Sequence, residues 1–82
     1  MKTKIEIETW IKEWIAKETD TDIIAIDVDT NFANFGMSSS QGILFSGDLS
    51  DWAGLNLDPS LVWDYPTIAS LTAYVESLSK SV

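Results

Sequence analysis

Three consecutive serines, Ser38 to Ser40, are the residues of this 82-residue chain whose side chains could most readily take part in chemistry. They follow Asn34-Phe35-Gly36-Met37 and open a segment whose apolar residues recur at helical spacing. A serine hydroxyl can act as a nucleophile, accept a covalent group, or cap a helix by accepting from the free amides of its first turn. We expect Ser39 in that first turn with its hydroxyl facing solvent, although spacing alone favours simple capping.

Hydrolytic chemistry at these serines is not expected. The stretch Gly36-Met37-Ser38-Ser39-Ser40 half matches a nucleophile elbow, but serine replaces the final glycine. The chain has no histidine, which removes the usual activating partner of a serine and the commonest metal ligand. It also has no cysteine, which excludes disulfides and thiolate metal sites.

A second motif, Asp27-Val28-Asp29-Thr30-Asn31, copies the first ligands of a calcium-binding loop. The match then fails, because Phe32 stands where glycine must turn the chain and Ser38 where a bidentate glutamate is needed. We therefore expect no metal site.

The composition is strongly acidic, with thirteen acidic residues, five lysines, no arginine and a net charge of −8. Such a charge repels nucleic acid and anionic membranes, and it either speeds encounter with basic proteins or only keeps a small domain soluble.

No apolar run approaches the roughly 18 residues that span a bilayer. Met1-Lys2-Thr3-Lys4 leads straight into an amphipathic pattern and not into a signal-peptide core, so we expect a cytoplasmic protein or a piece excised from one.

Hydrophobic periodicity and capping signals predict an all-α fold: a small bundle of three longer helices and one short helix, in one domain of residues 1–82 with its core at about 4–78. The predicted helices run from the Thr3 cap to Lys17 or Glu18, from the serines to Ala53-Gly54, from Pro59 to about Trp63, and from Thr67 to Leu78, with a frayed tail at 79–82. The expected core residues are Ile7, Trp10, Ile11, Trp14, Ile15, Ile43, Phe45, Leu49, Trp52, Ile68, Leu71, Tyr74, Val75 and Leu78.

The helical pattern fails between Glu18 and Ser38. Alternating apolar residues over 24–28 leave a short strand open, but we prefer a long ordered loop whose apolar residues hold it against the helices. Phe32 and Phe35 are the expected anchors that return this loop to the core before the serines.

Three further elements occur in order: Phe35-Gly36-Met37-Ser38-Ser39, Gly47-Asp48-Leu49-Ser50-Asp51-Trp52 and Asp64-Tyr65-Pro66-Thr67-Ile68. With them the chain, from about Ile7 to Leu78, resembles the acyl carrier protein domains of modular polyketide synthases. In that family a Gly-hydrophobic-Asp-Ser element starts the second helix and a Tyr-Pro-Thr-Ile element starts the last. The region of the second helix is most similar to carrier domains that follow fatty acyl-AMP ligases in bacterial, notably cyanobacterial, polyketide and olefin-forming pathways.

The resemblance implies a non-catalytic carrier with 4'-phosphopantetheine, taken from CoA, on Ser39. Two residues depart from the family pattern, because Ser38 replaces an aspartate that helps the phosphopantetheinyl transferase to recognise the site, and Ser40 replaces an aliphatic residue. Ser38 and Ser40 therefore stay open as acceptors, while the position relative to Gly36 favours Ser39.

The implied partners of a monomeric carrier are the phosphopantetheinyl transferase, an acyl-loading enzyme such as a fatty acyl-AMP ligase or acyltransferase, a ketosynthase and modifying domains. The candidate docking residues are Met37, Ser40, Gln41, Leu44, Asp48, Val62 and Trp63, with Trp63 favoured as core. Leu44 stands where carriers often have glutamate, so apolar contact is expected to matter more than charge there.

Two alternatives remain. One is an unmodified helical docking module, which would use its acidic and apolar surface only to bind a partner. The other is a peptidyl carrier, which Gly36-Met37 fits less well because peptidyl carriers usually have paired glycines before the serine.

Overall fold

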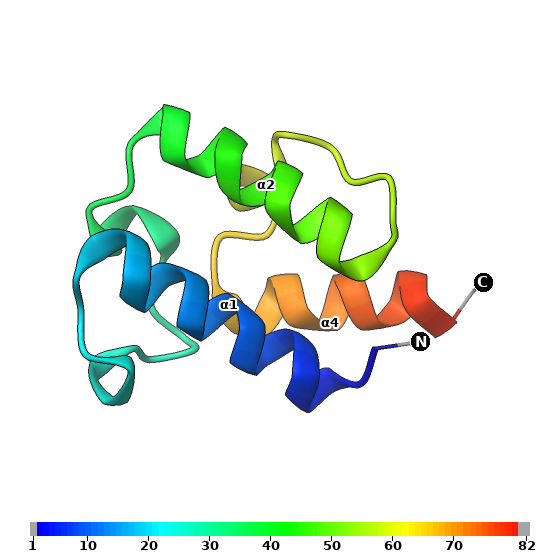
Figure 1. Ribbon diagram of the computed structural model, residues 1–82, viewed down its shortest axis with the longest axis horizontal. Coiled ribbons are helices and arrows are strands. Elements are labelled where there is room, and N and C mark those ends of the chain that lie inside the picture. Colours follow the sequence, from blue (N-terminus) through cyan, green and yellow to red (C-terminus); the bar gives the residue numbers. More distant parts are fainter. Residues whose placement is uncertain (1, 81–82) are drawn as a thin grey trace.

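Helices form almost all of the regular structure in the computed structural model, which describes residues 2–80 (Figure 1). The α-helices are α1 (Lys4–Thr19), α2 (Ser39–Ala53), α3 (Leu61–Asp64) and α4 (Ile68–Lys80), and two 3-10 helices, η1 (Ile23–Ala25) and η2 (Phe32–Phe35), lie between α1 and α2. Within the described residues there is no strand, and a single antiparallel bridge joins Asn31 to Thr67. The predicted all-α bundle of three longer helices and one short helix is confirmed.

The start of α1 is fixed by its own sequence. The hydroxyl of Thr3 accepts from the amide of Glu6 at 3.2 Å, and the Glu6 carboxylate accepts from the amide of Thr3 at 3.0 Å. This reciprocal capping box satisfies two amides of the helix terminus. Because the ionised carboxylate accepts a backbone hydrogen bond from Thr3, the pKa of Glu6 lies below its ordinary value.

The core is an apolar interior to which α1, α2 and α4 all contribute. Figure 1 shows α1 beside α4, and the two helices are in direct contact. The fully buried apolar side chains of these helices are Ile7, Ile11, Ile15, Phe45, Leu49, Ile68, Leu71 and Val75. Trp10 and Trp14 are half-buried at the edge of this core, where Trp10 stacks on Trp52 with ring centroids 5.2 Å apart. Both tryptophans therefore serve packing, as the sequence predicted.

The connection between α1 and α2 is an ordered loop built from turns and the two 3-10 helices. It is tied to the other end of the chain, since the amide of Phe32 donates to the carbonyl of Pro66 at 2.8 Å and the amide of Ala69 donates to the carbonyl of Val28 at 3.0 Å. Phe32 is buried and is the main anchor. Ile26 is buried as well, in agreement with an ordered loop held by its apolar residues, whereas Ile24 is 89% exposed and takes no part in holding it.

Helix boundaries differ from the prediction by one residue at the end of α1 and at the start of α4, and by two residues at two further places. The short helix α3 begins at Leu61 and not at Pro59, because the carboxylate of Asp58 accepts from the amide of Ser60 at 2.9 Å and holds these residues in a turn. The last helix continues to Lys80, and its Ser79 is buried, so Ser79 is not part of a frayed tail. Ser81 and Val82 lie outside the described residues.

Two expected core residues are exposed: Ile43 by 52% and Trp63 by 56%. Ile43 and Phe45 are two positions apart, which separates them by about 200° around an α-helix, so both cannot face the interior. Phe45 takes the inner face, together with the buried Gly42, Ser46 and Leu49. In the described part of the chain, no helix is long and apolar enough to cross a bilayer.

Candidate functional site

The serine cluster lies where the loop enters α2, and each serine has its own place there. Gly36 ends η2 in the left-handed conformation at φ 78°, which glycine adopts without strain and which redirects the chain toward α2. Ser38 is the N-cap of α2. Its hydroxyl accepts from the amide of Gln41 at 3.2 Å, and the side chain of Gln41 accepts from the amide of Ser38 at 2.8 Å.

Ser39 is the first residue of α2 and is exposed, as the sequence predicted. The first turn of α2 contains no acidic residue. Since Ser38 already bonds the amides of Gln41 and Gly42, the amides without an intrahelical partner are those of Ser39 and Ser40. The positive end of the helix dipole therefore meets solvent beside the Ser39 hydroxyl, in an arrangement that stabilises an anion attached there.

A cavity of about 200 Å³ opens beside Ser39, between the start of α2, η2 and α3. It is lined by Asn31, Phe32, Ala33, Met37, Ser38, Ser39, Gly42, Val62, Trp63 and Pro66. Gly42 lets α3 approach α2 closely, because a Cβ atom at this position would lie 3.1 Å from Cγ2 of Val62. The exposed serine thus stands at the rim of a hollow that two helices and the loop form together.

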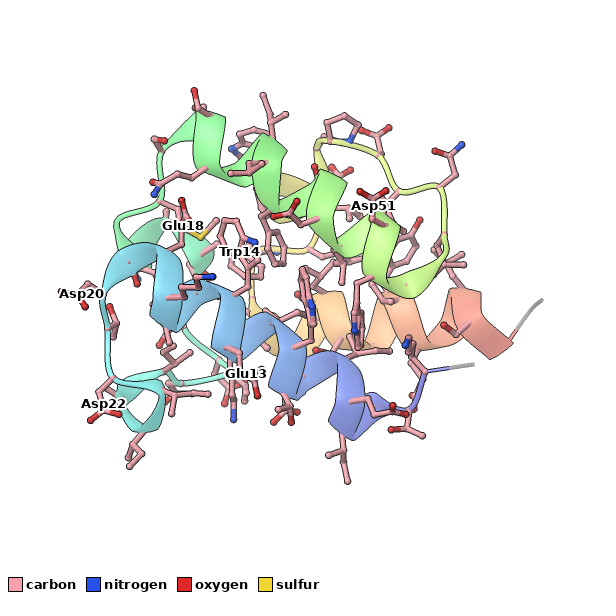
Figure 2. All side chains as sticks on the ribbon, viewed as in Figure 1. Glu13, Trp14, Glu18, Asp20, Asp22 and Asp51 are labelled. Atoms are coloured by element: carbon pink, nitrogen blue, oxygen red, sulfur yellow. The ribbon has the colours of Figure 1, made fainter. Side chains whose placement is uncertain are left out.

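The seven candidate docking residues fall into two groups. Those with exposed or half-exposed side chains near the start of α2 are Met37, Ser40, Leu44 and Trp63. Those with partners inside the molecule are Gln41 in the capping box, Asp48 in a bond to Trp14, and Val62 in the packing between α2 and α3. Figure 2 shows Trp14 projecting from α1 toward α2, where its Nε1 lies 2.8 Å from Oδ2 of Asp48.

Sequence reasoning missed Ile43 as a surface residue, although a helical wheel centred on Phe45 would have found it. The sequence also favoured Trp63 as a core residue. Both predictions assumed that a large apolar side chain is usually buried. Leu44 is 50% exposed, so its side chain is accessible to a partner.

The first residues of the calcium-like motif, Asp27 to Asp29, form a local turn. The Asp27 carboxylate accepts from the amide of Asp29 at 2.9 Å, which is a local turn interaction. Among the described residues, no group of three or more carboxylate side chains is placed to hold a metal ion.

Comparisons of the sequence and of the structure with known proteins agree on one family. A family model described as a phosphopantetheine attachment site matches residues 9–75. One relative, from the phenolphthiocerol/phthiocerol polyketide synthase of Mycobacterium tuberculosis, is 29% identical over 70 residues, which are 85% of this chain and 4% of that protein. The chain thus spans about 4% of the length of this curated relative. The acyl carrier protein TtuC of Teredinibacter turnerae is 30% identical over 89% of this chain and 84% of its own.

Solved structures of carrier proteins share the fold over nearly the whole chain. A free-standing peptidyl carrier protein from Acinetobacter baumannii superposes with a TM-score of 0.85 at 39% identity, over 92% of this chain and 94% of its own. Asl1650, an acyl carrier protein from Anabaena with a variant phosphopantetheinylation-site sequence, gives a TM-score of 0.86 at 32% identity, over 94% and 88%.

Proposed function

The chain belongs to the phosphopantetheine attachment site family, and we propose that it carries acyl groups as thioesters on a 4'-phosphopantetheine arm attached to Ser39. The observation that carries this proposal is the position of Ser39, which is exposed at the first residue of α2 within the matched region. The arm supplies the thiol that forms the thioester, and the chain supplies the attachment point and a surface that partner enzymes recognise.

The capping geometry supports Ser39 over Ser38 as the acceptor. The hydroxyl of Ser38 already accepts a hydrogen bond from Gln41 in the cap, and losing an N-cap costs about 1 kcal/mol. Ser40 is exposed, but it lies one residue further into the helix and about 100° around it, and the family resemblance favours Ser39.

In the attachment step the Ser39 oxygen forms a bond to the phosphorus that carries pantetheine in CoA. The bond from that phosphorus to the second phosphate breaks, adenosine 3',5'-bisphosphate leaves, and the serine proton passes to a base of the transferase. The new phosphodiester lies at the positive end of α2, which favours an anion by roughly 0.3–1 kcal/mol.

We place the cargo in the acyl class because the curated relatives cited above are a polyketide synthase and an acyl carrier protein. The matched peptidyl carrier shares the same fold, so the fold does not separate the two classes. The partners we propose are the phosphopantetheinyl transferase, an acyl-loading enzyme such as a fatty acyl-AMP ligase or acyltransferase, and a ketosynthase, all in the cytoplasm.

The test is intact-protein mass spectrometry after incubation with CoA, magnesium and a broad-specificity phosphopantetheinyl transferase, followed by peptide mapping. We expect one phosphopantetheine on Ser39, none in Ser39→Ala, and an unchanged adduct in Ser40→Ala. An adduct on Ser38 or Ser40 would keep the carrier function and overturn the site. Absence of any adduct with several transferases would favour the unmodified docking module.

A further inference from the structure

A second hollow lies away from the serine cluster, where the start of α1 meets the end of α2. This shallow groove has a volume of about 330 Å³ and is lined by Ile5, Glu6, Thr9, Trp10, Glu13 and Trp52, which together are called the tryptophan groove below. Figure 1 shows the start of α1 on the opposite side of the molecule from the start of α2, which carries Ser39. Along α2 itself, Ser39 and Trp52 are separated by about 20 Å. A short segment bound in the tryptophan groove would therefore not cover Ser39.

Two stacked tryptophan rings form the apolar part of the groove. Trp10 and Trp52 lie with their ring centroids 5.2 Å apart and their planes 19° from parallel. Both side chains are only half-buried, so part of their aromatic surface meets solvent. Ile5, which is 77% exposed, extends this apolar surface along α1. Contiguous apolar surface that is exposed and bounded by polar residues marks interaction sites in soluble proteins.

A positive charge of the chain itself already lies on this aromatic surface. The ammonium Nζ of Lys2 is 4.5 Å from the centroid of the Trp52 ring, a distance at which the negative face of the ring attracts a cation. The same ammonium acts on Glu6, whose pKa is lowered first by its hydrogen bonds with Thr3 and also by the charge of Lys2. Trp52 and Glu6 thus form an ammonium site that Lys2 occupies from within the chain.

Carboxylates on the rim of the tryptophan groove favour a positively charged partner. Glu6 and Glu13 are both exposed, and they lie about two turns apart along α1. Among the described residues, the ion pair of α1 joins Glu8 to Lys12 at 3.2 Å, and Glu13 takes part in none. The net charge of −8 adds a longer-range attraction for cations. The groove therefore matches a segment that presents positive charges beside aliphatic side chains.

We infer that the tryptophan groove binds a basic segment of a partner protein, one of whose lysines replaces Lys2 over the ring of Trp52. The aliphatic side chains of the segment pack on the exposed aromatic surface, and Glu6 and Glu13 hold its positive charges. Lys2 precedes α1, so its side chain can leave Trp52 while the helix stays intact. The inference goes beyond the proposed function, because this site needs no arm on Ser39.

A second copy of this chain is a poorer occupant of the groove, because each copy has a net charge of −8 and the copies repel each other. Sedimentation velocity tests this alternative directly. A dimer that Ile5→Glu dissociates would assign the groove to self-association and overturn the inference. A monomer at all concentrations supports it.

The decisive experiment titrates the unmodified, isotope-labelled protein with an acetylated and amidated peptide of alternating lysine and leucine, followed by NMR. We expect the indole Nε1–H signals of Trp10 and Trp52 to shift on binding. The signal of Trp14, whose indole donates to Asp48 at 2.8 Å, should change little. The same peptide with glutamine in place of lysine should bind about fivefold more weakly or worse. Equal affinities for the two peptides would overturn the inference.

Two matched pairs of variants test the residues of the site. Lys2→Ala removes the ammonium that competes from within the chain, so we expect it to raise the affinity for the lysine peptide about two- to fivefold. Its control is Lys17→Ala, which removes the same charge at an exposed position on the last turn of α1, outside the groove. Glu13→Gln should lower the affinity about twofold, and Glu18→Gln, at another exposed position on α1, should lower it less.

Circular dichroism and thermal unfolding confirm that each variant is folded. If Lys2→Ala binds the peptide no more tightly than Lys17→Ala does, the groove holds only the lysine of its own chain and the inference fails. Signal shifts spread evenly over the acidic residues of α1 would contradict it equally. Ser39→Ala keeps this test separate from that of arm attachment: unchanged peptide binding in this variant supports the inference, whereas loss of binding would place the peptide at the serine cluster and overturn it.

Discussion

The indole Nε1 of Trp14 donates a 2.8 Å hydrogen bond to Oδ2 of Asp48, and this bond joins α1 to α2. The ring of Trp14 also meets Phe45 edge to face, with centroids 5.0 Å apart. The resemblance to carrier proteins placed Asp48 among the candidate docking residues. In this protein Asp48 holds two helices together, so it is not free to meet a partner through this oxygen.

We expect Asp48→Ala to lower the free energy of unfolding by about 1–2 kcal/mol, because the half-buried indole N–H loses its charged acceptor. Urea unfolding followed by circular dichroism measures the change. Asp51→Ala is the control, since Asp51 is exposed on the same helix. In a double-mutant cycle with Trp14→Phe, additive effects of the two substitutions would contradict the interaction.

The cap of α2 gives a second prediction. Ser38→Ala should lower the free energy of unfolding by about 1 kcal/mol, and Ser38→Asp should restore it, because aspartate caps a helix as well as serine does. Both variants should still accept the arm on Ser39, as peptide mapping would show. If peptide mapping placed the arm on Ser38 of the original sequence, and folded Ser38→Ala accepted none, Ser38 would be the acceptor.

A buried hydroxyl on α4 gives a third prediction. Thr72 is fully buried, and in the described structure its Oγ1 has no hydrogen-bond partner. Thr72→Val keeps the shape and removes the unpaired group, so we expect a gain of about 1 kcal/mol in unfolding free energy. The matched control is Thr67→Val, where the hydroxyl accepts from the amide of Ser70 at 3.1 Å. That substitution should cost about 1 kcal/mol, and equal effects at both positions would contradict the distinction.

The fold was predictable from the sequence where local rules decide it. The capping box of Thr3 and Glu6 and the periodic apolar stripe of α1 identify that helix without reference to the rest of the chain. The same holds for Ser38 and the start of α2. In contrast, η2 was not predicted as a helix, because it is short and a long-range bond from Phe32 to Pro66 holds it in place.

The site was predictable only in part, for a physical reason. Residue type indicates that Ile43 and Trp63 prefer burial, but it does not say which face of a short helix has room for them. On α2 the inner face is set by Phe45, and that choice depends on contacts with α1 and the loop, including Trp14 and Phe32. The sequence therefore predicted the exposed position of Ser39 at the start of α2 and misplaced two apolar residues, Ile43 and Trp63.

The lowered pKa of Glu6 gives a pH-dependent prediction. A carboxylate whose pKa in the folded protein lies below its unfolded value stabilises the fold above the unfolded value of about 4.5, and this contribution is lost as pH falls through the folded pKa. Glu6→Gln should therefore lower the Tm near neutral pH, and the difference from the original protein should vanish in stronger acid. Glu13→Gln, on the exposed face of the same helix, is the control. A difference that persists or grows in acid would contradict the role assigned to this carboxylate.

Two helical glycines of α2 provide the last comparison. Alanine favours a helix over glycine by about 1 kcal/mol, so Gly47→Ala, where a Cβ atom meets nothing within 4 Å, should stabilise the protein by about that amount. Gly42→Ala gains the same helix propensity, but its Cβ would lie 3.1 Å from Cγ2 of Val62. Val62 must shift, so we expect a smaller gain or a net loss in urea unfolding. Shortening Val62 to alanine relieves the contact, and in that background the two glycine substitutions should differ less. Equal effects of Gly42→Ala and Gly47→Ala in the original sequence would show that α3 does not press against α2 at this point.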